Sequence, residues 1–309
     1  MLDRDGILPD VLAAVGHTPL IALQRIKPSN GVEIAVKLEG VNPGGSIKDR
    51  IAASLIAVAE KEGRLRPGGV IIEATAGNTG IALAMAAAVK GYRAVFVVPD
   101  KMSADKIAIL QAYGAEVKVV ADVPRDDINN YQHIAKRLAQ EIPGGCYIGQ
   151  FEQQANPEAH YLFTGPEIWN GSQGRVAALV AGAGTGGTIT GIGRYLKEKN
   201  PEILIIGADP VGSIFTGPVA PFKIEGMGED YYPETLDAKV VDRWVAVSDE
   251  EAFSMSRRLA REEGILAGGS TGAIVHVGLK IAYDLEPGSL IVAVAPDTGR
   301  NYLSNIFAK

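Results

Sequence analysis

The chain alternates short apolar runs with longer stretches in which apolar residues recur at helical spacing. Runs rich in valine and isoleucine predict buried strands at residues 69–75, 93–99, 115–120, 175–182, 202–209 and 289–296. The stretches between them predict helices at 47–63, 79–91, 106–114, 188–199, 249–264 and 272–285. Strands that are apolar throughout and alternate with helices indicate parallel sheets covered on both faces. The sequence therefore predicts an α/β fold.

Composition and charge narrow the class of protein. The 309 residues suffice for about two domains, and 47% hydrophobic with 21% charged residues is typical of a globular enzyme. A net charge of −6 offers no basic face for nucleic acid, and one cysteine with four histidines predicts neither a disulfide framework nor a metal site. The N-terminal residues lack the pattern of a signal peptide, and no apolar run is long enough to span a bilayer. We expect a cytoplasmic protein with no membrane partner.

One long segment breaks the periodic pattern. Residues 211–236 are rich in glycine and proline and show neither helical nor strand spacing. A loop of this length inside a compact domain is usually functional or mobile.

A lysine stands at an unfavourable place in the stretch "NPGGSIKDR", residues 42–50. Lys48 follows a glycine turn and falls in the first turn of a predicted helix, where a cation faces the positive end of the helix dipole. Sequences tend to break such local rules at functional sites. Lys37, in "AVKLEG", is the alternative lysine, and its place on a strand without a glycine turn favours a solvated or structural role.

Three further loops join a strand to a helix or open a helix, and open α/β sheets bind ligands at such junctions. "EATAGNTG" (73–80) offers Thr75, Asn78 and Thr79 with free backbone amides, which suits a carboxylate, although an N-cap turn is the alternative. "LAGGSTGA" (266–273) places Ser270 at another helix entry, where it is by itself an N-cap candidate.

The third loop, "VAGAGTGGTITG" (180–191), is built like a phosphate cradle. Gly182, Gly184 and Gly187 also satisfy the dinucleotide fingerprint G-x-G-x-x-G, and Asp209 stands where that fingerprint has its ribose acid. This alternative is weak as a lone match. The four loops together supply a lysine, phosphate donors and a partner for a ring nitrogen, which are the parts needed to hold pyridoxal 5′-phosphate.

The motifs "GGSIKDR", "AGNTGIALA", "GTGGTITG" and "GGSTGA" resemble those of the cysteine synthase and cystathionine β-synthase family, the fold type II pyridoxal-phosphate enzymes with a tryptophan synthase β-like fold. The resemblance runs over nearly the full length. It implies two domains, each a mostly parallel twisted sheet covered by helices. We expect a smaller domain at residues 40–146, which carries the substrate loop, and a larger cofactor-binding domain at 1–39 and 147–309.

The resemblance also implies roles for individual residues. Lys48 bonds covalently to the cofactor and later moves the Cα proton, Asn78 contacts the ring hydroxyl, and Ser270 faces the ring nitrogen. The phosphate loop consists of Gly184, Thr185, Gly186, Gly187 and Thr188. The substrate carboxylate falls to Thr75, Ala76, Gly77, Asn78, Thr79 and Gln150. Ala74 and Ala76 replace the proline and serine of most relatives, which puts fine specificity in question.

The family chemistry is elimination from a β-substituted alanine to an aminoacrylate, followed by addition of a thiol. Stretches such as "EGMGEDYYPETLDAKVVDRW" resemble the cystathionine β-synthase branch, which adds homocysteine to serine. The alternative is a cysteine synthase, which uses O-acetylserine and sulfide, and a more remote one is a relative that binds the cofactor without turnover. Neither haem nor S-adenosylmethionine regulation is expected. By resemblance we expect a homodimer that acts on small amino-acid and thiol substrates.

Overall fold

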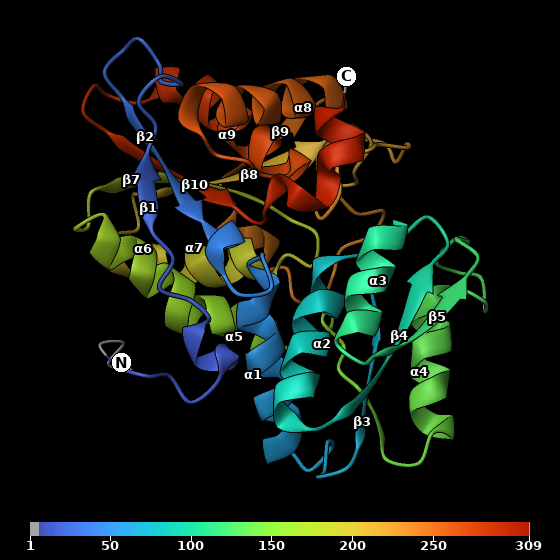
Figure 1. Ribbon diagram of the computed structural model, residues 1–309. Helices are drawn as coiled ribbons and strands as arrows, with labels where there is room; N and C mark the ends of the chain where they lie inside the picture. Colours follow the sequence, from blue (N-terminus) through green and yellow to red (C-terminus); the bar gives the residue numbers. More distant parts are fainter. Residues whose placement is uncertain (1–5, 309) are drawn as a thin grey trace. The chain divides into compact units, whose positions relative to one another are not determined.

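The computed structural model describes residues 6–308. Within that range the chain forms two compact units, each with its own sheet (Figure 1). The smaller unit comprises the described residues up to Val15 together with Asn42–Ala155. The larger unit comprises Gly16–Val41 and the described residues from Asn156 onward.

The borders of the units differ from the boundaries that we expect from the sequence. The short 3-10 helix η1 (Val11–Ala14) packs against a helix of the smaller unit and so belongs there, although it precedes residue 40. The predicted border at residue 146 falls inside β6 (Gly145–Tyr147), which pairs with the smaller sheet. Pairing and packing, rather than position along the chain, set these borders.

The sheet of the smaller unit has the strand order β5-β4-β3-β6, and all its pairs are parallel. The strands are β3 (Val70–Ala74), β4 (Arg93–Pro99), β5 (Glu116–Val120) and β6. Three of the predicted buried strands coincide with β3, β4 and β5. The prediction of burial is wrong for β5, because this strand lies at the sheet edge and its residues are exposed or half-buried.

Helices cover both faces of the smaller sheet. They are α1 (Lys48–Lys61), α2 (Asn78–Lys90), α3 (Ala104–Ala112) and α4 (Tyr131–Glu141). Side chains alternate across a strand, so Val70, Ile72 and Ala74 share one face, where Ile134 and Ala135 of α4 pack on them. Helices α1 and α2 pack on each other, and α2 contacts β3 and β4.

The sheet of the larger unit has the strand order β1-β2-β10-β7-β8-β9. Its strands are β1 (Leu20–Ala22), β2 (Glu33–Leu38), β7 (Val176–Gly182), β8 (Leu204–Pro210), β9 (Arg243–Val247) and β10 (Leu290–Ala295). The edge strand β1 pairs antiparallel with β2, and the other pairs are parallel. The central strands β10, β7 and β8 are buried almost throughout, as the apolar runs predict.

The helices of the larger unit are α6 (Gly165–Gly171), α7 (Gly187–Lys199), α8 (Asp249–Arg258) and α9 (Gly269–Ile281), and α5 (Ala155–Ala159) starts at the border. A π-helical turn, η3 (His160–Thr164), joins α5 to α6. Figure 1 shows α8 and α9 on one side of the sheet and α6 and α7 on the other. The core of this unit joins the inner faces of β2, β7, β8 and β10 to α8 and α9. Among the described residues no helix or strand lies between β8 and the 3-10 turn η4 (Ala238–Val240), as the sequence predicts for residues 211–236.

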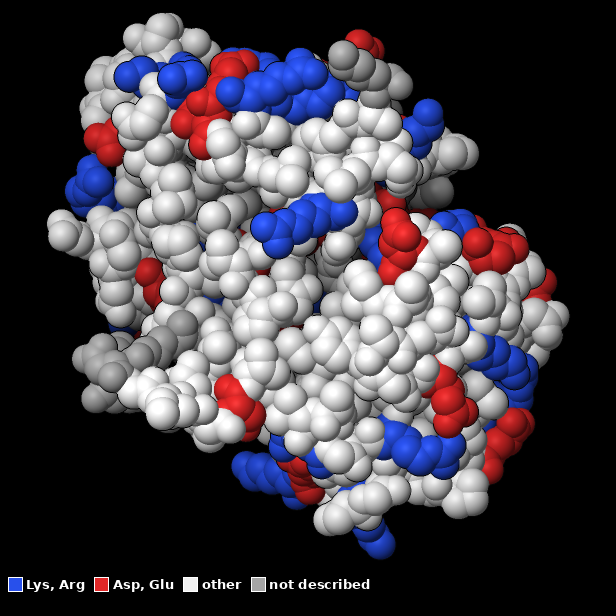
Figure 2. Space-filling model, viewed as in Figure 1, with Lys and Arg blue, Asp and Glu red and all other residues white. Residues whose placement is uncertain are grey.

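The charged side chains of the two signs are mixed on the surface. On the face in Figure 2, basic and acidic side chains are interspersed rather than gathered by sign. In the part of the chain that the structure describes, no helix has both the length and the apolar character needed to cross a bilayer.

Candidate functional site

The predicted site residues of the smaller unit all lie at the carboxyl edge of its parallel sheet. The loop Thr75–Thr79 follows the end of β3, and Gln150 follows the end of β6. Lys48 is the first residue of α1, the helix that leads back to the start of β3 and therefore begins at that same edge. Open α/β sheets place their ligand-binding groups at this edge.

The predicted site residues of the larger unit follow the same rule. The phosphate loop, Gly184–Thr188, leaves the carboxyl end of β7 and enters α7. Ser270 is the second residue of α9, the helix that returns the chain to the start of β10. The topology thus brings both segments to the carboxyl edge of the larger sheet.

Lys48 begins α1 as the sequence predicts, and the turn before it is held by its own polar groups. Gly45 adopts a φ of 83°, which favours glycine, and the carboxylate of Asp49 accepts a hydrogen bond from Gly44 N at 2.6 Å. Ser46 Oγ accepts a hydrogen bond from Lys48 N at 3.2 Å. The half-buried lysine therefore projects from a turn whose backbone is fixed on both sides.

The substrate loop closes on the hydroxyl of Thr75. Thr75 Oγ1 accepts hydrogen bonds from Gly77 N and from Gly80 N, both at 3.2 Å. Helix α2 begins at Asn78, its N-cap is Gly77, and no side chain of the N-cap residue is involved. The alternative of an N-cap turn is therefore correct only in part, since Thr75 caps the first turn from three residues ahead. Ala76 is exposed at the tip.

Gln150 is brought directly to this loop. Thr79 Oγ1 donates a hydrogen bond to Gln150 Oε1 at 2.5 Å, and Gln150 Nε2 donates to Ala74 O at 3.4 Å. The loop and Gln150, which are separated by about seventy residues, form one cluster in the smaller unit. A second side chain, the buried Lys106, reaches the same loop, because its Nζ would lie 3.9 Å from a Cβ at Gly77.

The glycines of the phosphate loop are required by close packing. Gly186 has a φ of 79° and forms the N-cap of α7 without any side-chain cap. A Cβ at Gly186 would collide with Leu236, and one at Gly187 would collide with the side-chain amide of Asn156. The loop therefore approaches its neighbours through backbone alone, and the N-cap residue contributes no side chain to the first turn of α7, a kind of helix start that suits an anion.

The two threonines of this loop are each oriented by a buried side chain that the sequence did not single out. Asn156 Nδ2 donates to Thr185 Oγ1 at 3.0 Å, and Gly187 N donates to the same oxygen at 3.4 Å. In both bonds the hydroxyl oxygen of Thr185 is the acceptor. The hydroxyl group can therefore still donate one hydrogen bond to another acceptor. His160 Nε2 lies 3.2 Å from Thr188 Oγ1.

The segment 211–237 packs on the phosphate loop from outside. Gly228 N donates to Ala183 O at 2.8 Å, Thr235 Oγ1 donates to Thr185 O at 2.5 Å, and Asp237 N donates to Thr190 Oγ1 at 2.9 Å. These bonds fix the carbonyl side of the loop and leave its amide side at the start of α7. The long aperiodic segment thus holds the phosphate loop in place by hydrogen bonds.

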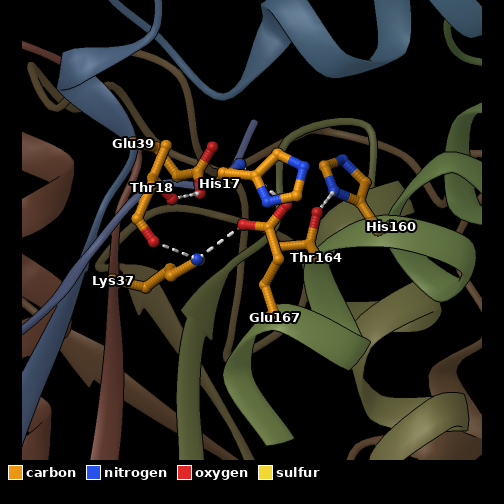
Figure 3. A network of polar contacts seen from close by, with 7 residues as sticks. All are labelled: His17, Thr18, Lys37, Glu39, His160, Thr164 and Glu167. Carbon is orange, nitrogen blue, oxygen red and sulfur yellow. Dashed lines mark hydrogen bonds and ion pairs between the residues drawn. The ribbon is translucent and has the colours of Figure 1, made fainter. Parts of the chain in front are cut away.

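Figure 3 shows a polar network around Lys37 and Glu167 beside His160 and Thr164. Lys37 is 1% exposed, and its Nζ donates to Thr18 O at 2.5 Å and to Glu167 Oε2 at 2.7 Å. Glu167 Oε1 in turn accepts from His17 N at 2.9 Å. Lys37 therefore has the structural role, and the solvated role is wrong.

Ser270 is buried, but it is not the N-cap of its helix. The N-cap of α9 is Gly268, where a Cβ would collide with the carboxylate of Asp297, so this helix starts with close-packed glycines like α7. The N-cap expectation for Ser270 is therefore wrong. Its neighbour Thr271 carries a buried hydroxyl for which the described residues supply no hydrogen-bond partner.

Asp209 does not fill the role of the ribose-binding acid that the dinucleotide alternative requires. Asp209 is fully buried at the end of β8, and its Oδ2 accepts a hydrogen bond from Thr216 Oγ1 at 2.7 Å. Burial raises the pKa of this carboxyl. Asp209 holds the chain's own loop rather than facing outward towards a ribose.

Sequence reasoning missed Glu73, Asn156 and His160. Glu73 interrupts the otherwise apolar run of β3, which is a signal that could have been noticed. Asn156 and His160 lie in a helical segment with no distinctive pattern, and only the tertiary structure brings them to the phosphate loop.

The chain matches known proteins over nearly its full length. The family model described as "Pyridoxal-phosphate dependent enzyme" matches residues 11–297. The cystathionine beta-synthase of Apis mellifera is 46% identical, over 99% of this chain and 63% of that protein. The cystathionine beta-synthase of Saccharomyces cerevisiae is 43% identical, over 96% of this chain and 62% of that protein. The chain thus spans less than two thirds of the length of these relatives.

Solved structures agree with the sequence matches. O-ureido-L-serine synthase superposes with a TM-score of 0.92 at 39% identity, covering 97% of this chain and 94% of that one. A hydrogen sulfide-producing enzyme from Fusobacterium nucleatum superposes with a TM-score of 0.91 at 38% identity, covering 96% of this chain and 100% of that one. The predicted α/β fold with mostly parallel sheets covered by helices and the resemblance stated from the motifs are confirmed. The chain belongs to the family of pyridoxal-phosphate dependent enzymes.

Proposed function

We propose that the chain catalyses a pyridoxal-phosphate dependent β-replacement in which serine or O-acetylserine reacts with homocysteine to give cystathionine. The observation that carries this proposal is the glycine loop at the start of α7. It combines a helix start whose N-cap is a glycine, the hydroxyls of Thr185 and Thr188, and glycines whose Cβ would collide with neighbours. Such a loop suits a dianionic phosphate.

The donor set fits the cofactor. The Thr185 hydroxyl accepts from Asn156 and from Gly187 N, so its proton can be given to a phosphate oxygen. Asn78 would contact the ring hydroxyl, Ser270 the ring nitrogen, and Lys48 would hold the cofactor covalently. A serine hydroxyl does not stabilise a protonated ring as a carboxylate would, which favours β-elimination over racemisation and transamination.

Pyridoxal phosphate, when bound, supplies the electron sink that allows the Cα–H bond to break. The amino group of the substrate would first displace Lys48 from its bond to the cofactor, and the freed Lys48 Nζ would then take the proton from Cα. A hydroxide leaving group must be protonated as it departs, whereas acetate leaves unaided. The ammonium group of Lys48 that results from proton abstraction is the acid available for this task.

The substrate carboxylate is assigned to the cluster at the end of β3. Backbone amides at the start of α2 and the side-chain amide of Gln150 are neutral donors, which suit a carboxylate. The hydroxyl of Thr79 donates to Gln150 Oε1 and so orients that side chain. Thr75 holds the shape of this loop through two backbone amides. Ala76 adds no hydroxyl at the exposed tip, so a donor contact that a serine there would make is missing.

The choice of acceptor rests on the relatives. The curated matches that are 43% and 46% identical over nearly the whole chain are cystathionine beta-synthases. The second candidate is a cysteine synthase that joins O-acetylserine and sulfide. The solved neighbour described as a hydrogen sulfide-producing enzyme releases sulfide rather than consuming it, so it supports sulfur chemistry in general but does not favour this second candidate.

A product assay separates the candidates. Purified protein loaded with pyridoxal phosphate is incubated with serine or O-acetylserine, each crossed with homocysteine, cysteine and sulfide, and products are identified by mass spectrometry. We expect cystathionine from homocysteine, with sulfide the poorer acceptor at matched concentration. Cysteine from O-acetylserine and sulfide, with no cystathionine from either donor, would establish the second candidate.

The matched control is Lys48→Ala. This variant should fold, lose the covalent link to the cofactor and lose turnover, because the role of the lysine is covalent. Normal turnover in the folded variant would refute the assignment. A wild-type protein that binds the cofactor but makes no product from any pair would favour the remote alternative of a non-catalytic relative.

We further propose a cytoplasmic homodimer. The family resemblance supports the dimer, and the single cysteine suits a reducing compartment. Light scattering coupled to size-exclusion chromatography tests the dimer directly.

A further inference from the structure

Glu73 is a polar exception in the middle of the smaller unit. It follows Val70, Ile71 and Ile72 in β3, and all five residues of this strand are buried. The side chain of Glu73 is 0% exposed. A carboxyl group in such a place is retained only where hydrogen bonds compensate its loss of water.

The compensation comes from three backbone amides. Glu73 Oε1 accepts from Ala74 N at 3.0 Å. Glu73 Oε2 accepts from Gly149 N at 2.7 Å and from Gln150 N at 3.3 Å. One carboxyl group therefore ties the end of β3 to the residues that follow β6.

These bonds begin where the strand ladder stops. The pairing of β3 with β6 ends at Ile72 and Tyr147, and Ile148 N adds a last bond to Ile72 O at 3.0 Å. Gly149 then turns with a φ of 74°, so the next amides point away from a strand partner. The side chain of Glu73 replaces the backbone acceptor that the ladder no longer supplies.

The consequence reaches the substrate loop. With its amide held by Glu73, Gln150 directs its side chain to Thr79 Oγ1 at 2.5 Å and to Ala74 O at 3.4 Å. Thr79 belongs to the segment assigned to the substrate carboxylate, and Ala74, the last residue of β3, directly precedes that segment. A displacement of the Gly149–Gln150 backbone would therefore move Gln150 away from Thr79.

We propose that Glu73 is a positioning residue, which holds Gln150 against the Thr75–Thr79 loop so that both bind the carboxylate of the amino-acid substrate. This role rests on the proposed function. Glu73 itself touches neither substrate nor cofactor in this assignment, and it acts through the amides of Gly149 and Gln150.

The charge of Glu73 is compatible with that role. Burial raises the pKa of this carboxyl to about 8, helped by the nearby Glu152 and opposed by the three amide donors. At neutral pH the group is mainly an uncharged acid, so it does not repel a substrate carboxylate bound one or two residues away.

The test compares Glu73→Gln and Glu73→Leu with the wild type, all loaded with pyridoxal phosphate. Glutamine keeps one acceptor oxygen, whereas leucine removes all the acceptors at similar size. Glu60→Gln is the matched control, because Glu60 lies in the same unit and pairs at the surface with Lys90 and Tyr92. Amide exchange at Gly149 and Gln150, cofactor content, and KM and kcat for the amino-acid donor are measured.

We expect faster exchange of both amides in each Glu73 variant and unchanged cofactor content. The donor KM should rise about tenfold in Glu73→Gln and further in Glu73→Leu, with kcat within about twofold of the wild type. The Glu60→Gln control should match the wild type throughout. Binding of L-alanine, an amino acid without a leaving group, should weaken in parallel with KM when measured by calorimetry.

Three results would overturn the proposal. Faster exchange with unchanged KM would make Glu73 a merely structural residue, and reduced cofactor content in Glu73→Gln would link it to the cofactor instead. Unchanged exchange and KM in Glu73→Gln would exclude both roles, even if Glu73→Leu fails to fold. Failure of the proposed function is distinct, because it appears in the wild type as lack of cofactor binding or of amino-acid turnover.

Discussion

His160 Nε2 lies 3.2 Å from the hydroxyl oxygen of Thr188, and the other ring nitrogen of His160 lies 2.9 Å from Thr164 Oγ1. The imidazole is fully buried on the π-helical turn η3. The ring of His160 therefore links Thr164, in the turn between α5 and α6, to Thr188 in the first turn of α7. It fixes the direction of a hydroxyl that we assign to the cofactor phosphate.

Replacing His160 by leucine should weaken cofactor binding. The change leaves Thr188 free to rotate, and a hydrogen bond contributes about 0.5–1.5 kcal/mol, so we expect the dissociation constant for pyridoxal phosphate to rise about tenfold. Fluorescence titration of the apoprotein measures it. Thr188→Val should give an effect of similar size, and Thr164→Val a smaller one. Unchanged affinity in both His160→Leu and Thr188→Val would count against the phosphate cradle.

Much of the fold could be predicted from the sequence because its central strands are apolar on both faces. Strands β3, β4, β7, β8 and β10 and the helices α1, α2, α3, α7, α8 and α9 correspond to predicted segments, with ends that differ by a few residues. The sequence pattern missed β1, β2, β6 and β9. Strands β1 and β6 have three residues each, β9 is largely half-buried, and the polar Glu33 and Lys37 interrupt the apolar pattern of β2. The burial of such strands is decided by their neighbours in the sheet, which local pattern does not encode.

The candidate site divides in a similar way. Gly186 and Gly187 could be predicted because a backbone that lies against Leu236 and Asn156 admits no Cβ, which leaves a glycine motif in the sequence. His160 and Glu73 could not be assigned roles from local pattern, because their partners lie 28 and 76 residues away. The positive φ of Gly186 can be inferred from the glycine at that position in the sequence. A buried hydrogen bond between residues far apart in the sequence leaves no such local pattern.

Lys37 and Lys48 can be distinguished by what their loss damages. Lys37→Met leaves Glu167 without its buried cationic partner, and breaking such a pair costs about 3 kcal/mol. We expect urea denaturation to show this loss while the protein still forms its covalent link to pyridoxal phosphate. A double variant that also carries Glu167→Leu should recover part of the stability, because it removes the buried negative charge that has lost the Lys37 cation. A stable Lys37→Met protein without the covalent link would make Lys37 the cofactor lysine.

Ser270→Asp should redirect the chemistry rather than unfold the protein. An acid in the first turn of α9 is favoured by the helix dipole, which offsets part of the cost of burying it. A carboxylate at the ring nitrogen would keep it protonated and strengthen the electron sink. We expect β-replacement to fall about tenfold, equivalent to about 1.4 kcal/mol, while exchange of the Cα proton rises. Proton NMR in deuterium oxide follows both processes.

The control for this change is Ser270→Ala, which removes the hydroxyl without adding charge. It should lower β-replacement without raising Cα exchange. If Ser270→Asp leaves the ratio of replacement to exchange as in the wild type, Ser270 does not face the ring nitrogen.

Glu73 should make the stability of the protein fall with rising pH. Its pKa is about 8 in the folded protein against an ordinary value of 4.5, so between these values the folded chain binds a proton that the unfolded chain has released. The free energy of unfolding therefore decreases as pH rises through this window, by at most about 1.4 kcal/mol per pH unit from this group. The contribution is fully present below pH 4.5 and is lost as pH rises through about 8.

Urea denaturation of the wild type and Glu73→Gln at matched pH values isolates this contribution, because every other group is shared. Glu152 and Cys146 lie close enough to Glu73 to interact with its charge, and both are present in both proteins. We expect the wild type to lose its advantage over Glu73→Gln steadily from about pH 5 to 8. Glu60→Gln should behave differently, since burial, which raises the pKa of Glu60, is outweighed by Lys90 and Tyr92, which lower it and confine its effect to the acidic side. A constant difference between the wild type and Glu73→Gln from pH 5 to 8 would mean that the three amide donors keep Glu73 ionised, and that burial does not control its charge.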